Sequence, residues 1–186
     1  LTDAICVSIA AQGCLPILNL GLEYYRDWVG IVVYPDEFVI PRTVEDEFGV
    51  VHEYEDIASG EAWEGGPVLI SWHDAQMAGD GYNVVIHEFA HQLDQETGPA
   101  NGAPALRPGQ SAQTWAQVFQ RAYDDLIWLA NAGEPTLIDS YGATAPEEFF
   151  AVVTETFFMQ PRALATQHPE LYGQLRLFYR LDPQVW

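Results

Sequence analysis

Two kinds of apolar pattern divide the chain. Short runs rich in β-branched and aromatic residues, separated by proline and glycine, predict four strands in the first half, at residues 31–34, 37–40, 50–55 and 68–72. Apolar residues at helical spacing predict five helices: residues 2–20, with an interruption near Gly13 and Pro16, a stretch between a cap at Asp80 and a stop at Gly98-Pro99, and residues 111–132, 146–160 and 168–179. This order of elements predicts an α+β fold in which the strands form one small, mostly antiparallel sheet.

The helix predicted after Asp80 carries the run His87-Glu88-Phe89-Ala90-His91. Positions i and i+4 lie on one face of a helix, so the His87 and His91 rings can converge on one metal ion. Zinc suits such a pair because it accepts imidazole readily and takes four-coordinate geometry. Glu88 lies near enough to reach a water molecule on the ion and is the natural general base. The run therefore predicts a zinc peptidase with one zinc ion per chain.

A catalytic zinc site keeps one coordination position for water and so needs a third protein ligand. Glu148 is the preferred candidate, because a carboxylate in the first turn of an apolar helix is favoured by the helix dipole or held against a metal. Glu155, about two turns further along the same face, remains the alternative, either as a ligand or as a hydrogen-bond partner of a ligating imidazole. Asp94 is a second candidate for such a hydrogen bond. The remaining histidines lack a partner at ligand spacing: His52, His73 and His168.

The strand predicted at residues 68–72 is expected to lie beside the metal-binding helix. There it could offer a free edge to which an extended peptide adds as a further strand. The stretch 96–109 is rich in proline, glycine and alanine and predicts a loop at the rim of the cleft.

Length and composition bound the class of protein. With 186 residues and 48% hydrophobic content, the chain is long enough for one well-filled core, which predicts a single domain over residues 1–186. The apolar stretches are far shorter than the roughly 20 residues of a transmembrane helix, so we expect a soluble protein. The formal net charge of −20, from 27 acidic and 7 basic side chains, opposes broad contact with nucleic acid or an anionic membrane.

The two cysteines, Cys6 and Cys14, fall within one predicted helix, where eight residues of rise separate them by roughly 12 Å, beyond disulfide reach. Neither has a second cysteine or a histidine at metal-ligand spacing, so both are expected to be small core residues. This usage fits a reducing compartment and predicts a cytoplasmic protein. The chain begins at Leu1 without a charged and apolar leader, so a longer precursor could have carried one.

Four segments together resemble the Mlc titration factor A family of bacterial zinc peptidases, over nearly the whole chain: residues 31–35 (IVVYP), 66–72 (GPVLISW), 87–94 (HEFAHQLD) and 141–158 (YGATAPEEFFAVVTETFF). Around the metal the pattern is also similar to the catalytic domain of anthrax lethal factor, where H-E-F-x-H is followed by a tyrosine and then by a glutamate at the start of a helix. The resemblance implies a zincin-like fold with Glu148 as the third zinc ligand. It also implies that Tyr141 is an active-site residue whose hydroxyl could stabilise an oxyanion; the alternative for Tyr141 is a buried packing role.

The resemblance further implies an aminopeptidase-like activity on peptide substrates, of the gluzincin type that combines H-E-x-x-H with a glutamate. It also keeps open a different function, a zinc-containing regulatory protein that binds a transcriptional repressor and has weak or vestigial hydrolysis. Longer family members carry an N-terminal segment that this chain lacks, which is expected to affect how the cleft is covered.

Overall fold

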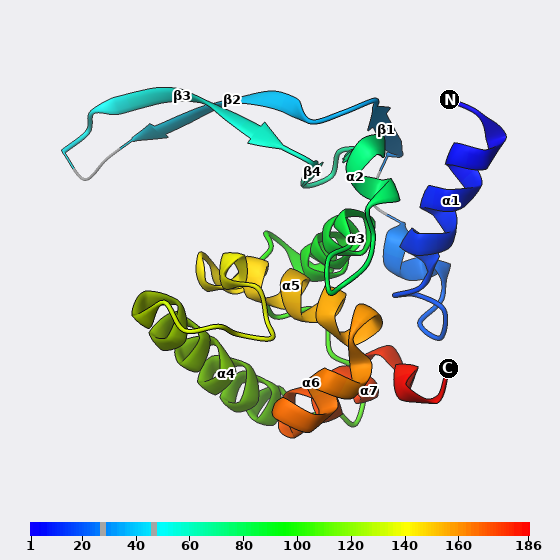
Figure 1. The fold of residues 1–186 in the computed structure, drawn as a ribbon, viewed down its shortest axis with the longest axis vertical. Coiled ribbons are helices and arrows are strands. Elements are labelled where there is room, and N and C mark those ends of the chain that lie inside the picture. Colours follow the sequence, from blue (N-terminus) through cyan, green and yellow to red (C-terminus); the bar gives the residue numbers. More distant parts are fainter. Residues whose placement is uncertain (27–28, 46–47) are drawn as a thin grey trace.

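The computed structural model describes residues 1–26, 29–45 and 48–186 and confirms an α+β architecture (Figure 1). Within these residues the α-helices are α1 (Asp3–Cys14), α2 (Trp72–Gln76), α3 (Val84–Asp94), α4 (Ala112–Ala132), α5 (Pro146–Met159), α6 (Pro161–Gln167) and α7 (Pro169–Tyr179). The strands are β1 (Ile31–Tyr34), β2 (Phe38–Glu45), β3 (Val51–Ala58), β4 (Gly60–Ala62) and β5 (Val68–Ser71). Short 3-10 helices are η1 (Leu22–Tyr25), η2 (Gln95–Thr97), η3 (Ser140–Ala143) and η4 (Pro183–Val185).

The helix ends follow local capping chemistry. Helix α4 begins after Ser111, whose side chain accepts a hydrogen bond from the Thr114 N–H, and it ends at Ala132, in agreement with the range predicted from the sequence; Gly133 follows in the left-handed conformation. Helix α3 is capped by Asn83, which accepts from the Ile86 N–H, so the predicted cap at Asp80 is wrong. Asp80 instead occupies the tight turn between Gly79 and Tyr82, with a φ of 52°.

The strands form two sheets, so the prediction of one sheet is wrong. One sheet has the order β1-β5-β4, with β1 parallel and β4 antiparallel to β5, and the other is the antiparallel pair β2-β3. Strand β5 is central, with β1 and β4 on its two edges, and all four of its residues are buried, with Val68 and Ile70 in the core cluster that includes Ile9 and residues of α3. The free edge that was expected on β5 is therefore found on β4 instead. Among the described residues β4 pairs only with β5, and it lies against α3.

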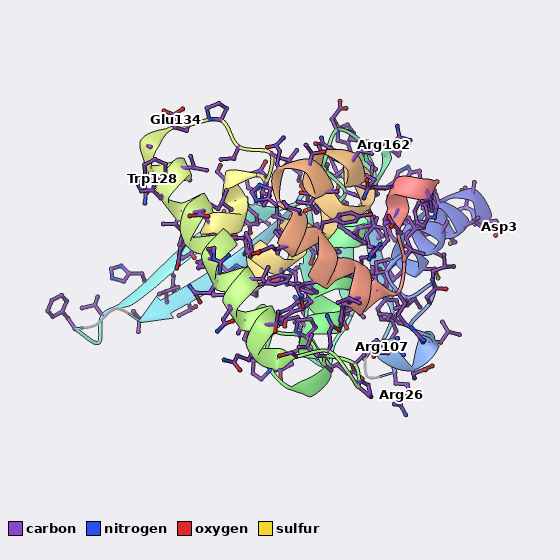
Figure 2. All side chains as sticks on the ribbon, turned by 90° about the horizontal axis from the view of Figure 1, so that it is seen from below. Asp3, Arg26, Arg107, Trp128, Glu134 and Arg162 are labelled. Carbon is purple, nitrogen blue, oxygen red and sulfur yellow. The ribbon has the colours of Figure 1, made fainter. Side chains whose placement is uncertain are left out.

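The β2-β3 ribbon projects away from the helical body in both views of the molecule (Figures 1 and 2). Its register runs from Phe38 opposite Ala58 at the base to Glu45 opposite Val51 near the tip. At its base the ribbon continues through Ser59 directly into β4. The ribbon is thus an extension of the edge strand that borders α3.

Helices α3 and α5 form the centre of the molecule. All eleven residues of α3 are buried, because one set of its side chains packs with α4, α5 and α7 and another packs with β5 and α1. Residues 149–158 of α5 are buried as well, and Phe150 lies against the stacked rings of Trp115 and Phe119, whose centroids are 4.0 Å apart. The polar residues of α3 are therefore held inside a rigid scaffold. Trp128, near the end of α4, lies outside this core and is exposed (Figure 2).

Helix α1 ends at Cys14, where the sequence predicted an interruption near Gly13 and Pro16, and residues 15–20 form turns instead of continuing the helix. Its inward face consists of Ile5, Ile9 and Gly13, and the cysteines stand one position away from this stripe. Cys6 and Cys14 are free and exposed, so the expectation that they are core residues is wrong. None of the helices in the described part of the chain has the length and apolar character needed to cross a membrane.

Candidate metal centre

Helix α3 brings the two predicted histidines together. His87 and His91 are one turn apart, their ring centroids are 4.9 Å apart, and their planes are inclined by 76°. The two Nε2 atoms approach to 3.2 Å, so both point toward the same position. Glu88 lies between them in sequence and is also buried, at 5% exposure.

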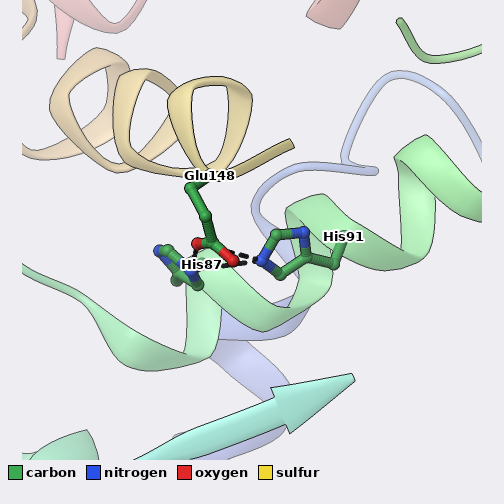
Figure 3. Close-up of side chains that lie close together, drawn as sticks. All are labelled: His87, His91 and Glu148. Carbon is green, nitrogen blue, oxygen red and sulfur yellow. Dashed lines mark hydrogen bonds and ion pairs between the residues drawn. The ribbon is translucent and has the colours of Figure 1, made fainter. Parts of the chain in front are cut away.

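Glu148 reaches the same position from the first turn of α5, a helix that begins with Pro146 (Figure 3). Its Oε2 atom is 3.0 Å from His87 Nε2 and 3.5 Å from His91 Nε2. One ligand atom from each of these residues lies within 4.8 Å of the others. Two imidazole nitrogens and one carboxylate oxygen form a donor set that fits a divalent metal ion and leaves coordination positions open.

Glu155, the alternative ligand, contacts the opposite side of the His87 ring. Its Oε1 is 2.8 Å from His87 Nδ1, and its Oε2 accepts a hydrogen bond of 2.5 Å from the Asn83 N–H at the start of α3. A carboxylate only accepts hydrogen bonds, so Nδ1 carries a proton, and Glu148 favours a second proton on Nε2 of the metal-free ring. Burial opposes this charge, but the two carboxylates outweigh it and raise the pKa of His87. A metal ion would replace the Nε2 proton and leave the Nδ1–H on Glu155. Of the two roles left open for Glu155, the geometry fits hydrogen bonding to the imidazole.

Asp94 is placed differently from the prediction. It is buried, and its Oδ2 accepts from the backbone N–H groups of Asn101 and Gly102, at 2.7 and 2.6 Å. It therefore anchors the predicted rim loop to the end of α3. No metal-ligand group found in the described part of the chain includes His52, His73 or His168.

Burial and neighbouring charges tune the acids of the site. Burial opposes ionisation of Glu148, but the hydrogen bonds from His87 and His91 outweigh it and lower the pKa of this carboxyl well below its usual value. Burial raises the pKa of Glu88, although the two imidazoles partly counteract it. One buried and one partly buried carboxyl with opposite pKa shifts thus lie within one small site, which is typical of functional centres.

A cleft of about 630 Å³ opens beside these residues. It is lined by His87, Glu88 and Glu155, by Tyr82 and Tyr141, and by parts of β3 and α5. Tyr141 stands on η3 with its ring centroid 6.0 Å from that of His87, and its exposure of 54% excludes the buried packing alternative. Burial, followed by the charges of Glu148 and Glu88, raises the pKa of Tyr141 to about 12, so its hydroxyl keeps its proton at neutral pH.

Among the cleft residues that were not anticipated from the sequence are Arg42, Gly60 and Tyr82. Arg42 extends from β2 and pairs with Glu61 at 2.5 Å and with Asp56 at 3.3 Å. A glycine within a strand often marks the close approach of another group, which was the one available signal for Gly60. Nothing in the local pattern distinguishes Arg42 or Tyr82 from ordinary surface residues.

Residues 1–180 match the family described as glucose-regulated metallo-peptidase M90. The chain belongs to this family. Relatives named Mlc titration factor A, from Escherichia fergusonii and Salmonella arizonae, are 37% and 38% identical over 94% of the chain and over 68% and 71% of their own lengths. An uncharacterized protein of Synechocystis is 41% identical over the whole chain and 69% of its own length.

Membership of the M90 family confirms the resemblance drawn from the sequence segments. A metallopeptidase family and a His-His-Glu donor set agree with each other, since both call for a divalent metal ion. The donor set also accounts for three polar side chains of the α3–α5 interface that would otherwise have no evident use in so apolar an environment.

If Glu148 is a ligand and Glu155 only orients His87, the two alanine variants will differ in metal affinity. Glu155→Ala keeps the three donors and should weaken zinc binding by about 10–100-fold, whereas Glu148→Ala removes a donor and should weaken it further. A competition titration with a chromophoric zinc chelator measures both. Glu147→Ala, one position away from the donor, is the matched control and should bind zinc like the parent. The reverse order of the two effects would move the third ligand to Glu155.

Proposed function

We propose that this M90 family member is a zinc-dependent, aminopeptidase-like enzyme of zincin type, with His87, His91 and Glu148 as ligands of one zinc ion. The observation that carries the proposal is the convergence of these three donors beside a cleft that Glu88 also lines. Zinc is preferred because two imidazoles and one carboxylate with an open position form a common catalytic zinc site. When bound, zinc supplies Lewis-acid chemistry, polarising the scissile carbonyl and acidifying a water molecule.

Glu88 is the proposed general base. It takes a proton from the attacking water and passes it to the amine that leaves when the peptide bond breaks. A base needs a pKa close enough to the working pH to accept the proton and then release it, and burial shifts the pKa of Glu88 in this direction. Its position one residue after His87 keeps it next to the zinc-binding group.

Tyr141 is proposed to donate a hydrogen bond to the oxyanion that forms on the substrate carbonyl. Its hydroxyl is protonated at neutral pH, and the ring stands half-exposed in the cleft near His87. A donor already held in place stabilises developing negative charge without reorganising in the transition state.

The cleft also suggests how a peptide would lie and which charge it would carry. Strand β4 borders the cleft and pairs with one strand only among the described residues, so an extended substrate could add along its other edge. Asp56, Asp80 and Asp139 line the cleft, and its arginine, Arg42, is already paired with acidic side chains. A negative lining favours a free α-amino group, which supports aminopeptidase action.

Glu88→Gln is the decisive variant, because it keeps the size of the side chain and removes its basicity. Zinc content should remain equal to that of the parent, while kcat should fall by about 10²–10⁴-fold. Both proteins are assayed on aminoacyl substrates and on the same substrates with a blocked amine. Preference for the unblocked set would identify an aminopeptidase, and equal turnover by the two proteins would refute the role of Glu88.

Tyr141→Phe removes the hydroxyl and keeps the ring. If the hydroxyl acts on the oxyanion, kcat should fall by about 10²–10³-fold while KM changes little, because the interaction forms in the transition state. Steady-state kinetics at equal zinc content measure the two constants. A change confined to KM would instead assign Tyr141 to ground-state substrate binding.

A second candidate function is the binding of a transcriptional repressor, which the name Mlc titration factor A of two relatives favours. The net charge of −20 would attract a basic DNA-binding domain. A pull-down with a purified Mlc-type repressor should capture parent and Glu88→Gln equally if binding is separable from catalysis. The same assay at raised salt tests the electrostatic part, and failure of both proteins to bind would remove this function.

A further inference from the structure

The edge strand β4 approaches α3 most closely at Gly60. A Cβ atom built on Gly60 would lie 2.5 Å from Oε1, 2.6 Å from Cγ and 2.8 Å from Cδ of Glu88. Non-bonded carbon atoms do not come this close to carbon or oxygen, so no side chain fits at position 60 while Glu88 keeps its place. The backbone of Gly60 therefore lies directly against the side chain of Glu88.

The strand has little freedom to retreat from this contact. On one side, the Ser71 N–H donates to Ser59 O at 2.7 Å and the Trp63 N–H donates to Pro67 O at 3.2 Å. On the other side, Gln95 Nε2 donates to Ala62 O at 3.2 Å. Because β4 is tied to β5 and to the end of α3, an added methyl group would displace the Glu88 side chain rather than the strand.

The Glu88 carboxylate depends on packing for its orientation. The hydrogen bonds found within residues 1–26, 29–45 and 48–186 include none to this carboxylate, whereas His87 is bonded at both ring nitrogens. Contact with Gly60 is thus the constraint that limits where the carboxylate can turn.

We propose that Gly60 is a positioning residue for the general base: its missing side chain creates the space in which the Glu88 carboxylate faces the cleft, and its backbone closes the other orientations. The inference rests on the proposed role of Glu88 in catalysis, although the contact itself does not. It predicts that a side chain at position 60 acts on turnover through Glu88.

The first test compares Gly60→Ala with the parent enzyme. A displacement of about 1 Å in a reacting group can cost about 10²-fold, so kcat should fall by this order while KM and zinc content stay near the parent values. Gly173→Ala on α7 is the matched control, since a Cβ there meets nothing within 4 Å, and its kcat should equal that of the parent. Full kcat in Gly60→Ala would overturn the inference.

The second test does not need activity. Overpacking should lower the Tm of Gly60→Ala by about 3–8 °C, and the same substitution made in a Glu88→Ala background should lower Tm little, because the methyl group then has room. An equal loss in both backgrounds would show that residue 60 does not act through Glu88 and would overturn the inference. A parent without peptidase activity would refute the proposed function, while the pair of Tm differences would still decide whether Gly60 limits Glu88.

Discussion

The burial of α3 and α5 against each other is the constraint on which the site depends. Ionisable groups in this interface are removed from water, and an unpartnered charge there costs about 3–5 kcal/mol. The cost is avoided because Glu155 satisfies both His87 Nδ1 and the Asn83 N–H, while Glu148 faces the two Nε2 atoms. The apolar packing of the helices and the polar pairing of the site therefore require each other, and neither helix can shift without exposing an unpaired group.

In this arrangement, helix α5 and the β3–β4 segment each contribute to the site in more than one way. Helix α5 supplies Glu148 at its first turn, and Val152, Thr156 and Gln160, which follow at intervals of four residues, line the cleft further along the same face. The chain segment that forms β3 and β4 borders the cleft first as a projecting ribbon and then as the edge strand over α3. The cleft is thus built between one rigid helix face and one continuous stretch of extended chain.

The parts of the structure that the sequence predicts best are those decided by neighbours along the chain. The spacing of His87 and His91 and the apolar stripes of α4 and α5 are local patterns, and these elements are where they were expected. The sheet was predicted less well, because β1 pairs with β5 across the intervening ribbon, and such long-range pairing leaves no local signal. The cap of α3 was misplaced although its signal is local, since Asn83 is a preferred N-cap residue and accepts a hydrogen bond from the Ile86 N–H three residues on.

The choice of the third metal ligand shows the same limit of prediction from local sequence patterns. Glu148 and Glu155 lie on one face of one helix, so the sequence pattern preferred Glu148 for its place in the first turn but left Glu155 open as a ligand, and family resemblance then implied Glu148 as well. In the structure the two carboxylates lie on opposite nitrogens of a single ring, a distinction that depends on where α3 crosses α5. The position of the crossing follows from the packing of the whole core, which periodicity does not encode.

The two neighbouring residues His87 and Glu88 are held in different ways, and their proposed roles explain the difference. A metal ligand should keep its proton on the other ring nitrogen and hold one orientation, and the hydrogen bond of Nδ1 to Glu155 provides this for His87. A general base must gain and lose a proton, and hydrogen bonds to its carboxylate would lower its pKa and hold the charged form. Packing against Gly60 limits the orientation of Glu88 without that penalty, and burial can then raise its pKa. Packing therefore orients the proposed base, whereas hydrogen bonding orients the proposed ligand. For this reason a glycine in the edge strand matters to the chemistry proposed for α3.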